Sequence, residues 1–216
     1  MKKSSRSLFA AAVLILMLAL AGCGAAFDPV SFVQGSLDAA IRGNVSQEFI
    51  DSVDDVDSVE ELEADYDEML DLVTDTTLAS AGFTDASESI RAGLKDMFAN
   101  LMSKTKYEVT GEYTEEGDGY TVEVTAYPLI TYGKVLEDAD GTVENTVMAR
   151  CTASMTMEEI LNIYMEEMIK AMNAALENPE YGEAQTFDIA VTMDDEGYYT
   201  VDETDVEELT NFLLGM

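Results

Sequence analysis

Two cysteines, Cys23 and Cys151, are the side chains in this sequence best suited to covalent chemistry, and the chain contains no histidine. A thiol nucleophile normally needs a neighbouring base such as histidine to form its thiolate. Without histidine, most zinc, haem and catalytic-triad chemistry is also removed. Cys151 lies among Met148, Ala149 and Ala153, so we expect a buried, unreactive side chain there, as is common for free cysteine. The sequence therefore predicts no catalytic residues and no enzyme activity.

The N-terminal segment that ends at Cys23 has three recognisable parts. Lys2, Lys3 and Arg6 give it a basic start, residues 8–20 are apolar and rich in Ala, Leu and Met, and small residues precede the cysteine. This is the pattern of a secretory signal peptide. The apolar run is too short and wrongly flanked for a stable membrane span.

The last four residues of that segment, Leu20-Ala21-Gly22-Cys23, resemble the lipobox of bacterial lipoproteins. The resemblance implies that the Cys23 thiol receives a diacylglycerol and that cleavage occurs between Gly22 and Cys23. We therefore expect a signal peptide over residues 1–22 and a lipidated tether over 23–26. The lipid would hold the exported protein at the outer face of the cytoplasmic membrane. The alternative is an ordinary cleaved signal with an incidental cysteine.

The charge balance is strongly acidic, with 11 Lys and Arg against 44 Asp and Glu and a net charge of −33. Such a chain is poorly suited to bind nucleic acid or anionic lipid through electrostatics, and it should collect cations instead. Hydrophobic residues make up 47% of the chain, which argues against disorder, because disorder combines high charge with low hydrophobicity. A salty or acidic habitat would favour the same balance.

Two acidic segments are candidates for calcium binding. Carboxylates are dense from Asp54 to Asp71, and calcium takes six to eight oxygen ligands; spread around a helix, however, such residues usually form a solvated face. Residues 138–141, Asp-Ala-Asp-Gly, would need acidic residues at Leu136 and Val147 to form an EF-hand loop. We therefore expect a turn at residues 138–141. We also expect no cofactor in the protein, and calcium binding is retained as the one alternative.

Methionines are concentrated in the C-terminal half of the chain. Thioethers can bind Cu(I), but three of these methionines fall on one stripe of a predicted helix, and core packing is the favoured interpretation. A methionine-lined groove for a peptide or apolar ligand is also compatible with this stripe. Its candidate lining residues are Tyr164, Met165, Met168 and Met172, and the wider run adds Met148, Met155 and Met157.

Capping residues and apolar spacing predict several helices. Asp28-Pro29 starts one that Gly43 ends, and capping boxes at Ser58/Glu61 and Thr156/Glu159 start two longer ones. Further helices are expected near 46–53, from 84 or 85 to 103, and after a Thr204/Glu207 cap, and the long helix from Thr156 should end near Asn178-Pro179.

Period-two alternation predicts two hairpins, one over residues 107–126 with a turn at Gly117-Asp118-Gly119 and one over 185–202 with a turn at 195–197. Pro128 should end the first. Residues 129–154 fit either a further hairpin or a broken helix. Because Val, Thr and Ile are common there, we favour strands.

The order of these elements resembles an uncharacterised family of small lipoproteins from Gram-positive bacteria. The resemblance rests on residues 32–39, on Lys106-Tyr107-Glu108-Val109 and residues 119–124, and on Asn178-Pro179-Glu180-Tyr181-Gly182. Some members look related to the nuclear transport factor 2-like, or cystatin-like, fold. The resemblance implies helices on a curved antiparallel sheet and brings no catalytic residues.

We therefore predict one α+β domain over residues 27–216, with a helical part over about 27–104 and a sheet plus a long helix over about 105–216. The N-terminal helices and the long helix should pack on the sheet, with an apolar groove between sheet and long helix. The predicted function is a non-catalytic module that binds a ligand or an envelope protein. The alternatives are a calcium-dependent structural protein and a small enzyme that uses a buried Asp with Tyr partners.

Overall fold

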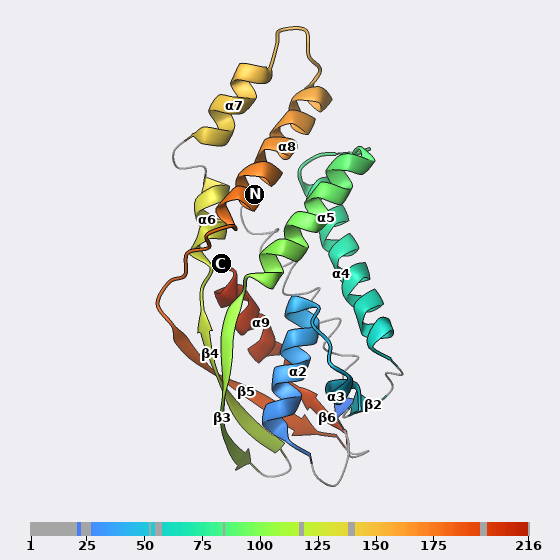
Figure 1. Cartoon of the computed structure of the whole chain (residues 1–216), viewed down its shortest axis with the longest axis vertical. Coiled ribbons are helices and arrows are strands. Elements are labelled where there is room, and N and C mark those ends of the chain that lie inside the picture. Colours follow the sequence, from blue (N-terminus) through green and yellow to red (C-terminus); the bar gives the residue numbers. More distant parts are fainter. Residues whose placement is uncertain are drawn as a thin grey trace.

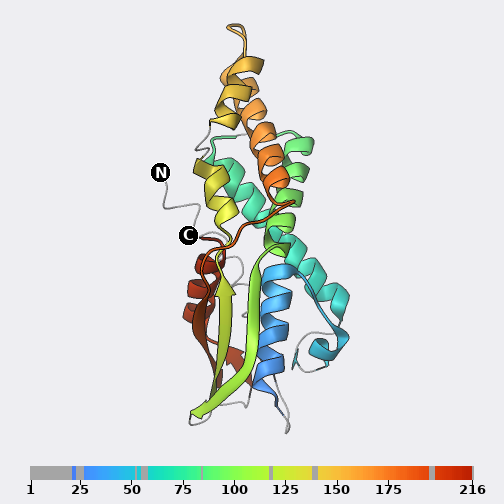
Figure 2. The ribbon, with the colours of Figure 1, turned by 60° about the vertical axis from the view of Figure 1, so that its left-hand side comes forward.

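The computed structural model describes residues 21–22, 27–51, 53–54, 58–83, 85–116, 119–137, 141–194 and 198–215. The molecule is elongated, with a sheet and its covering helices at one end and a group of helices at the other (Figures 1 and 2). This arrangement confirms the α+β class.

Helix α2, Pro29–Arg42, begins and ends where the sequence predicts. The Asp28 side chain accepts a hydrogen bond from the backbone N–H of Val30, and Gly43 closes the helix in the left-handed conformation at φ 62°. The N–H of Gly43 then bonds the last carbonyls of the helix, which is the usual role of glycine at this position. The short helix α3, Gln47–Ile50, follows, capped by Ser46.

Helices α4, Val59–Ser80, and α5, Glu88–Ser103, form the next layer. Ser58 caps α4 through the N–H of Glu61, as predicted. Helix α5 starts a few residues later than expected, because its N-cap is Ser87.

The sheet has the strand order β2-β1-β6-β5-β4-β3 among the described residues, and all its pairs are antiparallel. Both predicted hairpins are confirmed, and the first ends before Pro128 as expected. Residues 117–118 and 195–197 of their turns lie outside the described residues. The strands are β1 (Ala21–Gly22), β2 (Val53–Asp54), β3 (Lys106–Glu116), β4 (Gly119–Tyr127), β5 (Gln185–Met193) and β6 (Tyr199–Val201).

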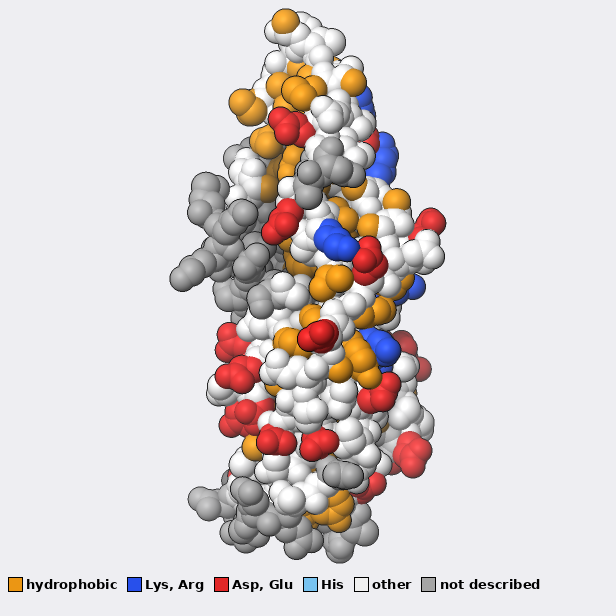
Figure 3. Space-filling model, turned by 90° about the vertical axis from the view of Figure 1, so that its left-hand side faces the viewer, with side chains coloured by type: hydrophobic (Ala, Val, Ile, Leu, Met, Phe, Trp, Pro, Cys, Tyr) orange, Lys and Arg blue, Asp and Glu red, His pale blue; other side chains and the backbone are white. Residues whose placement is uncertain are grey.

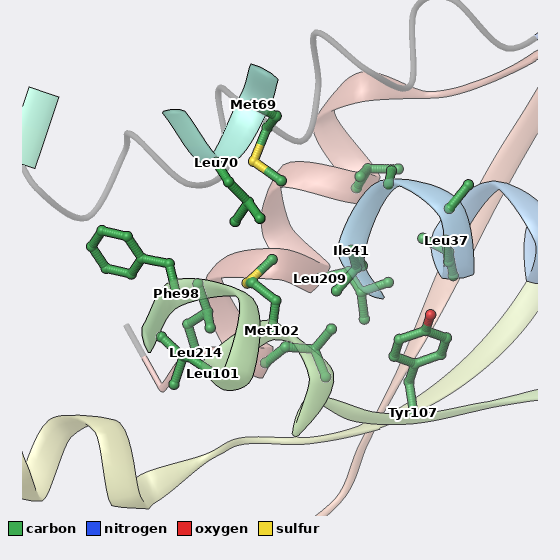
Figure 4. Close-up of a cluster of buried hydrophobic side chains, with 14 of the residues drawn as sticks. Leu37, Ile41, Met69, Leu70, Phe98, Leu101, Met102, Tyr107, Leu209 and Leu214 are labelled. Carbon is green, nitrogen blue, oxygen red and sulfur yellow. The ribbon is translucent and has the colours of Figure 1, made fainter. Parts of the chain in front are cut away.

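One face of this sheet carries the main core. Val122, Val124 and Ile189 are fully buried, and Val122 lies opposite Ile189 in the β4–β5 ladder. Helix α2 packs on β3, β4 and β5, and the C-terminal helix α9, Glu203–Leu213, packs on β4 and β5. Figure 4 shows Leu37 of α2 and Leu209 of α9 in the same cluster of buried side chains.

The cap of α9 differs from the predicted one. Asp202, two residues before Thr204, is the N-cap, and its side chain accepts hydrogen bonds from the N–H groups of Thr204 and Asp205. Aspartate is at least as good an N-cap as threonine, so the helix begins two residues earlier than predicted.

Residues 129–154 form helices, and the favoured prediction of strands was wrong. Helix α6 covers Ile130–Glu137 and α7 covers Thr142–Arg150. Val143 and Val147 are four residues apart, so they share one helical face, and both are buried in α7, which packs on α8. This packing overrides the β-propensity of Val, Thr and Ile. The predicted turn at 138–141 lies outside the described residues except for Gly141.

The long helix α8, Met157–Ala175, has the predicted Thr156/Glu159 capping box and ends slightly earlier than expected. It packs on α5, α6 and α7, whereas α2 and α9 are the helices that pack on the sheet. The expected contact between long helix and sheet is therefore wrong. The reason is that an apolar stripe specifies a buried face but not which element covers it. With α7, the first half of α8 forms an arm at the far end of the molecule (Figure 1).

Candidate functional site

An apolar cavity of about 180 Å³ lies among the helices at the end of the molecule away from the sheet. Helices α5 and α8 form two of its walls with side chains three or four residues apart, so each wall is one helical face. Helix α6 and one residue of α4 complete it. The lining residues are Thr77, Leu94, Met97, Phe98, Tyr132, Leu136, Tyr164, Met165, Met168, Ile169 and Met172.

Burial is graded from the back of this cavity to its rim. Met172 and Met165 are 1% and 7% exposed, whereas Tyr164 and Leu136 are 43% and 49% exposed. The cavity therefore opens to solvent where α6 and α8 face each other. On the side of the molecule shown in Figure 3, hydrophobic side chains gather over the upper part and acidic ones lie mainly along the lower part.

All four residues predicted to line a groove, Tyr164, Met165, Met168 and Met172, line this cavity. Its position differs from the predicted one, since it lies between helices instead of between the sheet and the long helix. Sequence reasoning missed the contribution of Tyr132, which lies in the segment expected to be strand. A helix over the α5 segment was predicted, but not its pairing with α8.

The cavity is suited to hold an apolar group about the size of one aromatic ring. Pockets for drug-sized ligands are roughly 300–1,000 Å³, whereas a cavity of about 150 Å³ accommodates benzene. Among the described residues, the lining is apolar apart from the hydroxyl groups of Thr77, Tyr132 and Tyr164. Methionine side chains are flexible and polarisable, so Met165, Met168 and Met172 can adapt to ligands of different shape.

A second cavity, of about 430 Å³, lies beside α2 and α3 and is more polar. Its most informative residue is Asp38, because the alternative of an acid–base enzyme requires an Asp with Tyr partners. The Tyr107 hydroxyl donates a hydrogen bond to Asp38 Oδ1 at 2.7 Å, and Arg42 Nη1 lies 2.9 Å from the same oxygen. Gln34 Nε2 donates to Asp38 Oδ2 at 2.6 Å.

These contacts attach α2 to β3. Arg42 lies 3.9 Å from the centre of the Tyr107 ring and also donates to the Thr105 carbonyl at 2.9 Å. Burial, together with the negative charge of Asp38, raises the pKa of Tyr107 above its usual range, so the phenol remains a hydrogen-bond donor. Both oxygens of Asp38 are thus engaged in holding the fold together. Sequence reasoning missed this cluster because Asp38 and Tyr107 are 69 positions apart.

The remaining predicted sites are distributed over the molecule. Cys151 is half-exposed at the end of α7, so the expected burial is wrong; its neighbours Met148 and Ala149 lie on the exposed face of that helix. Cys23 lies outside the described residues, and Gly22 lies in β1.

The acidic run of α4 is mostly solvated or ion-paired. Lys95 Nζ lies 2.8 Å from Asp67 and 2.9 Å from Asp71, while Glu60 and Glu63 are exposed. Within the described ranges, no group of three or more Cys, Asp or Glu side chains is placed to hold a metal ion. Residues 55–57 lie outside these ranges, and calcium binding stays a prediction.

No protein-family model and no curated protein matches the chain. A solved structure of a Bacillus subtilis protein assigned as a lipoprotein (ycdA) is similar in fold, with a TM-score of 0.58 and 13% sequence identity. The match covers 85% of this chain and 55% of the Bacillus protein, so the chain spans about half of its length. At this identity the likeness shows the fold alone. The nuclear transport factor 2-like relationship stays a prediction. In the part of the chain that the structure describes, no helix is both long and apolar enough to span a bilayer.

Proposed function

We propose that the protein is a lipoprotein anchored through Cys23 at the outer face of the cytoplasmic membrane, and that it binds an apolar group without catalysis. The lipobox at residues 20–23 supports the anchor, as does the shared fold with a bacterial protein assigned as a lipoprotein. The observation that carries the binding role is the apolar cavity lined by Met165, Met168 and Met172.

The anchor would place the sheet end of the molecule near the membrane. Phe27 follows Cys23 by four residues, and a chain of that length spans at most about 14 Å. Its ring is fixed at the sheet, stacked on Tyr199 at 3.9 Å and close to Tyr120 at the start of β4. The arm and the helices α5, α6 and α8, which line the cavity, lie toward the other end of the long axis (Figure 1). The cavity would therefore be held away from the lipid surface and accessible from outside.

The anchor is tested by growing cells with a fatty acid that carries a chemical label. The wild-type chain and the control Cys151→Ser should take up the label, and Cys23→Ser should not, because only Cys23 lies in the lipobox. Labelled Cys23→Ser, or an unlabelled wild-type chain, would contradict the lipid anchor.

The cavity is tested by NMR of methionine methyl groups in the intact protein, titrated with small aromatic compounds, short fatty acids and peptides with one exposed Phe or Leu. The methyl signals of Met165, Met168 and Met172 should shift together, and that of Met193, an exposed residue of β5, should not. Met168→Trp should fill the cavity and abolish the shifts of Met165 and Met172, while Met193→Trp should leave them intact. If no ligand shifts these signals selectively, the binding proposal is wrong.

The acid–base alternative is less favoured, because the side chain that best fits it is already engaged. Asp38 accepts hydrogen bonds from Tyr107, Gln34 and Arg42. An enzyme of this type needs a carboxyl group that is available to exchange a proton with a substrate.

A further inference from the structure

We propose that the loop at the end of the arm, with the sulfur atoms of Met148, Cys151, Met155 and Met157, forms a binding site for a soft monovalent metal ion, Cu(I) or Ag(I). This site is distinct from the apolar cavity and does not depend on it or on the lipid anchor.

The structure divides the methionine run into two groups. Met165 and Met172 are buried, and Met168 lines the cavity, so packing explains these three. Met148 and Met157 are 59% and 71% exposed. Leaving such long apolar side chains in water forgoes their burial energy, so core packing does not account for them.

Three of the four sulfur-bearing residues are brought together by the end of α7 and the turn after it. Met148 lies in the last turn of α7 and precedes Cys151, the C-cap residue of that helix, by three residues. A spacing of three residues across the end of a helix keeps the two positions close together. The N–H of Met155 bonds the Thr152 carbonyl at 3.1 Å, which folds the loop back on itself. The Thr152 N–H in turn donates to Met155 Sδ at 3.4 Å. That contact fixes the thioether beside the residue that follows Cys151.

Met157 lies on the other side of the same loop, as the first residue of α8. Helices α7 and α8 pack on each other, and the loop joins them at the outer end of the arm (Figures 1 and 2). The site is therefore open to solvent, and the flexible, exposed side chain of Met157 can supply a fourth sulfur ligand.

The ligand chemistry of this loop selects a soft ion. Thioether and thiolate sulfur favour Cu(I) over hard cations such as Ca²⁺ and Mg²⁺, which take oxygen ligands. In a chain with 44 acidic residues, residues 145–157 contain none, and most of them are exposed. A bound monovalent ion would displace the thiol proton of Cys151, and the thiolate would neutralise its charge. The nearby Arg150 is already paired with Glu166 and Glu167.

The proposal is tested by calorimetric titration of the full chain in detergent micelles with Ag(I), which needs no reductant. A Cys23→Ser background leaves Cys151 as the single thiol of the chain. We expect the calorimetric titration to show one tightly bound ion. In a parallel NMR titration, the methyl signals of Met148, Met155 and Met157 should shift as this ion binds. Replacing these three methionines by leucine keeps size and hydrophobicity but removes the sulfur, and should weaken binding by roughly tenfold or more. Cys151→Ser should do the same, and the control Met193→Leu should not.

Three outcomes would overturn the site. Unchanged affinity in the triple leucine variant would show that the thiol binds alone and that the methionines serve as an apolar surface. If Met193→Leu weakened Ag(I) binding as much as the triple leucine variant does, or if methyl signals shifted at methionines throughout the protein, the result would show an adventitious ion only. An absence of binding in the Cys23→Ser background would exclude the site directly. Thermal unfolding midpoints equal to that of the background protein would establish that the variants remain folded.

Discussion

Helix α2 at the sheet end and helix α8 at the helical end bury their apolar side chains to very different degrees. In α2, at the sheet end, Val33, Leu37 and Ile41 are all fully buried. In the 19 residues of α8, at the helical end, only Met165 and Met172 are buried among the described side chains. The cavity and the large exposed side chains of Leu136, Met148, Met157 and Tyr164 all belong to the helical end.

This difference indicates that stability and binding are separated along the long axis. A helix with a fully buried apolar face, such as α2, contributes strongly to the global free energy of unfolding. An arm with few buried contacts can open locally without unfolding the rest, and binding regions are commonly of this kind. The comparison leads to three predictions about matched substitutions at the two ends and a fourth about pH dependence at the sheet end.

The largest effect is expected from leucine truncation. Leu37→Ala at the sheet end should reduce the free energy of unfolding by about 2–5 kcal/mol, because it leaves a void in a fully buried site. Leu136→Ala, at a residue 49% exposed at the helical end, should change it by less than about 0.5 kcal/mol. Urea unfolding measures both, and equal losses would contradict the separation.

Replacing glycine by alanine should change the free energy of unfolding in opposite directions at two positions, one after α2 and one in α6. Gly43 has φ 62°, and an added Cβ would come within 2.5 Å of the Tyr66 ring. Gly43→Ala should therefore cost about 2 kcal/mol or more. Gly133 lies in α6 with open space around it, so Gly133→Ala should stabilise by about 0.5–1 kcal/mol. Thermal unfolding of both variants provides the test, and a stabilising Gly43→Ala would be inconsistent with the left-handed cap.

Removing a helix cap should lower the global stability of the protein at the sheet end, but only the local stability of the helix at the helical end. Asp28→Ala removes the cap of α2, and Thr156→Ala removes the cap of α8. Each costs about 1 kcal/mol of helix stability. We expect the loss at Asp28 to appear in the midpoint of global unfolding, and the loss at Thr156 mainly as faster amide exchange over residues 157–160. A similar fall in global stability for both would show that the arm unfolds with the core.

The smallest effect is a pH dependence at the sheet end. Burial raises the pKa of Asp205 above its usual value of 3.8, despite a hydrogen bond from the Ala190 N–H at 2.9 Å. The native state thus holds this proton more tightly than the unfolded chain does. The stabilisation from Asp205 is complete below the unfolded pKa and is lost as the pH rises through the raised folded value. Asp205→Asn keeps an oxygen acceptor and should flatten this dependence.

Urea midpoints between pH 4 and 7 measure this effect. The wild-type protein should lose more stability than Asp205→Asn across the interval. Identical slopes would exclude Asp205 as a contributor, and Glu63→Gln, at an exposed residue of α4, provides the control for a simple change in net charge.

Local signals in the sequence predicted the parts of the fold that local forces determine. The caps at Asp28, Ser58 and Thr156 were correct because each is set by hydrogen bonds within three residues. Both hairpins were correct because alternation gives each strand a buried face. Residues 129–154 were misassigned because the burial that makes them helical comes from α8, later in the chain.

The candidate site shows the same limit. The stripe of Met165, Met168 and Met172 identified one wall of the cavity from sequence alone. The opposite wall at Phe98 and Tyr132 depends on how three helices meet, and no local pattern specifies this. The exposed methionines of the arm looked equivalent to the buried ones, since residue type does not report burial.

Strand β1 has a consequence for the maturation of the protein. It consists of Ala21 and Gly22, and it pairs with Val53 and Asp54 of β2 on one side and with Tyr199 of β6 on the other. If cleavage precedes Cys23, as proposed, the signal peptidase removes this strand. The backbone groups of β6 that β1 had paired would then be available to another extended segment. The precursor would thus protect a sheet edge that only the processed protein exposes.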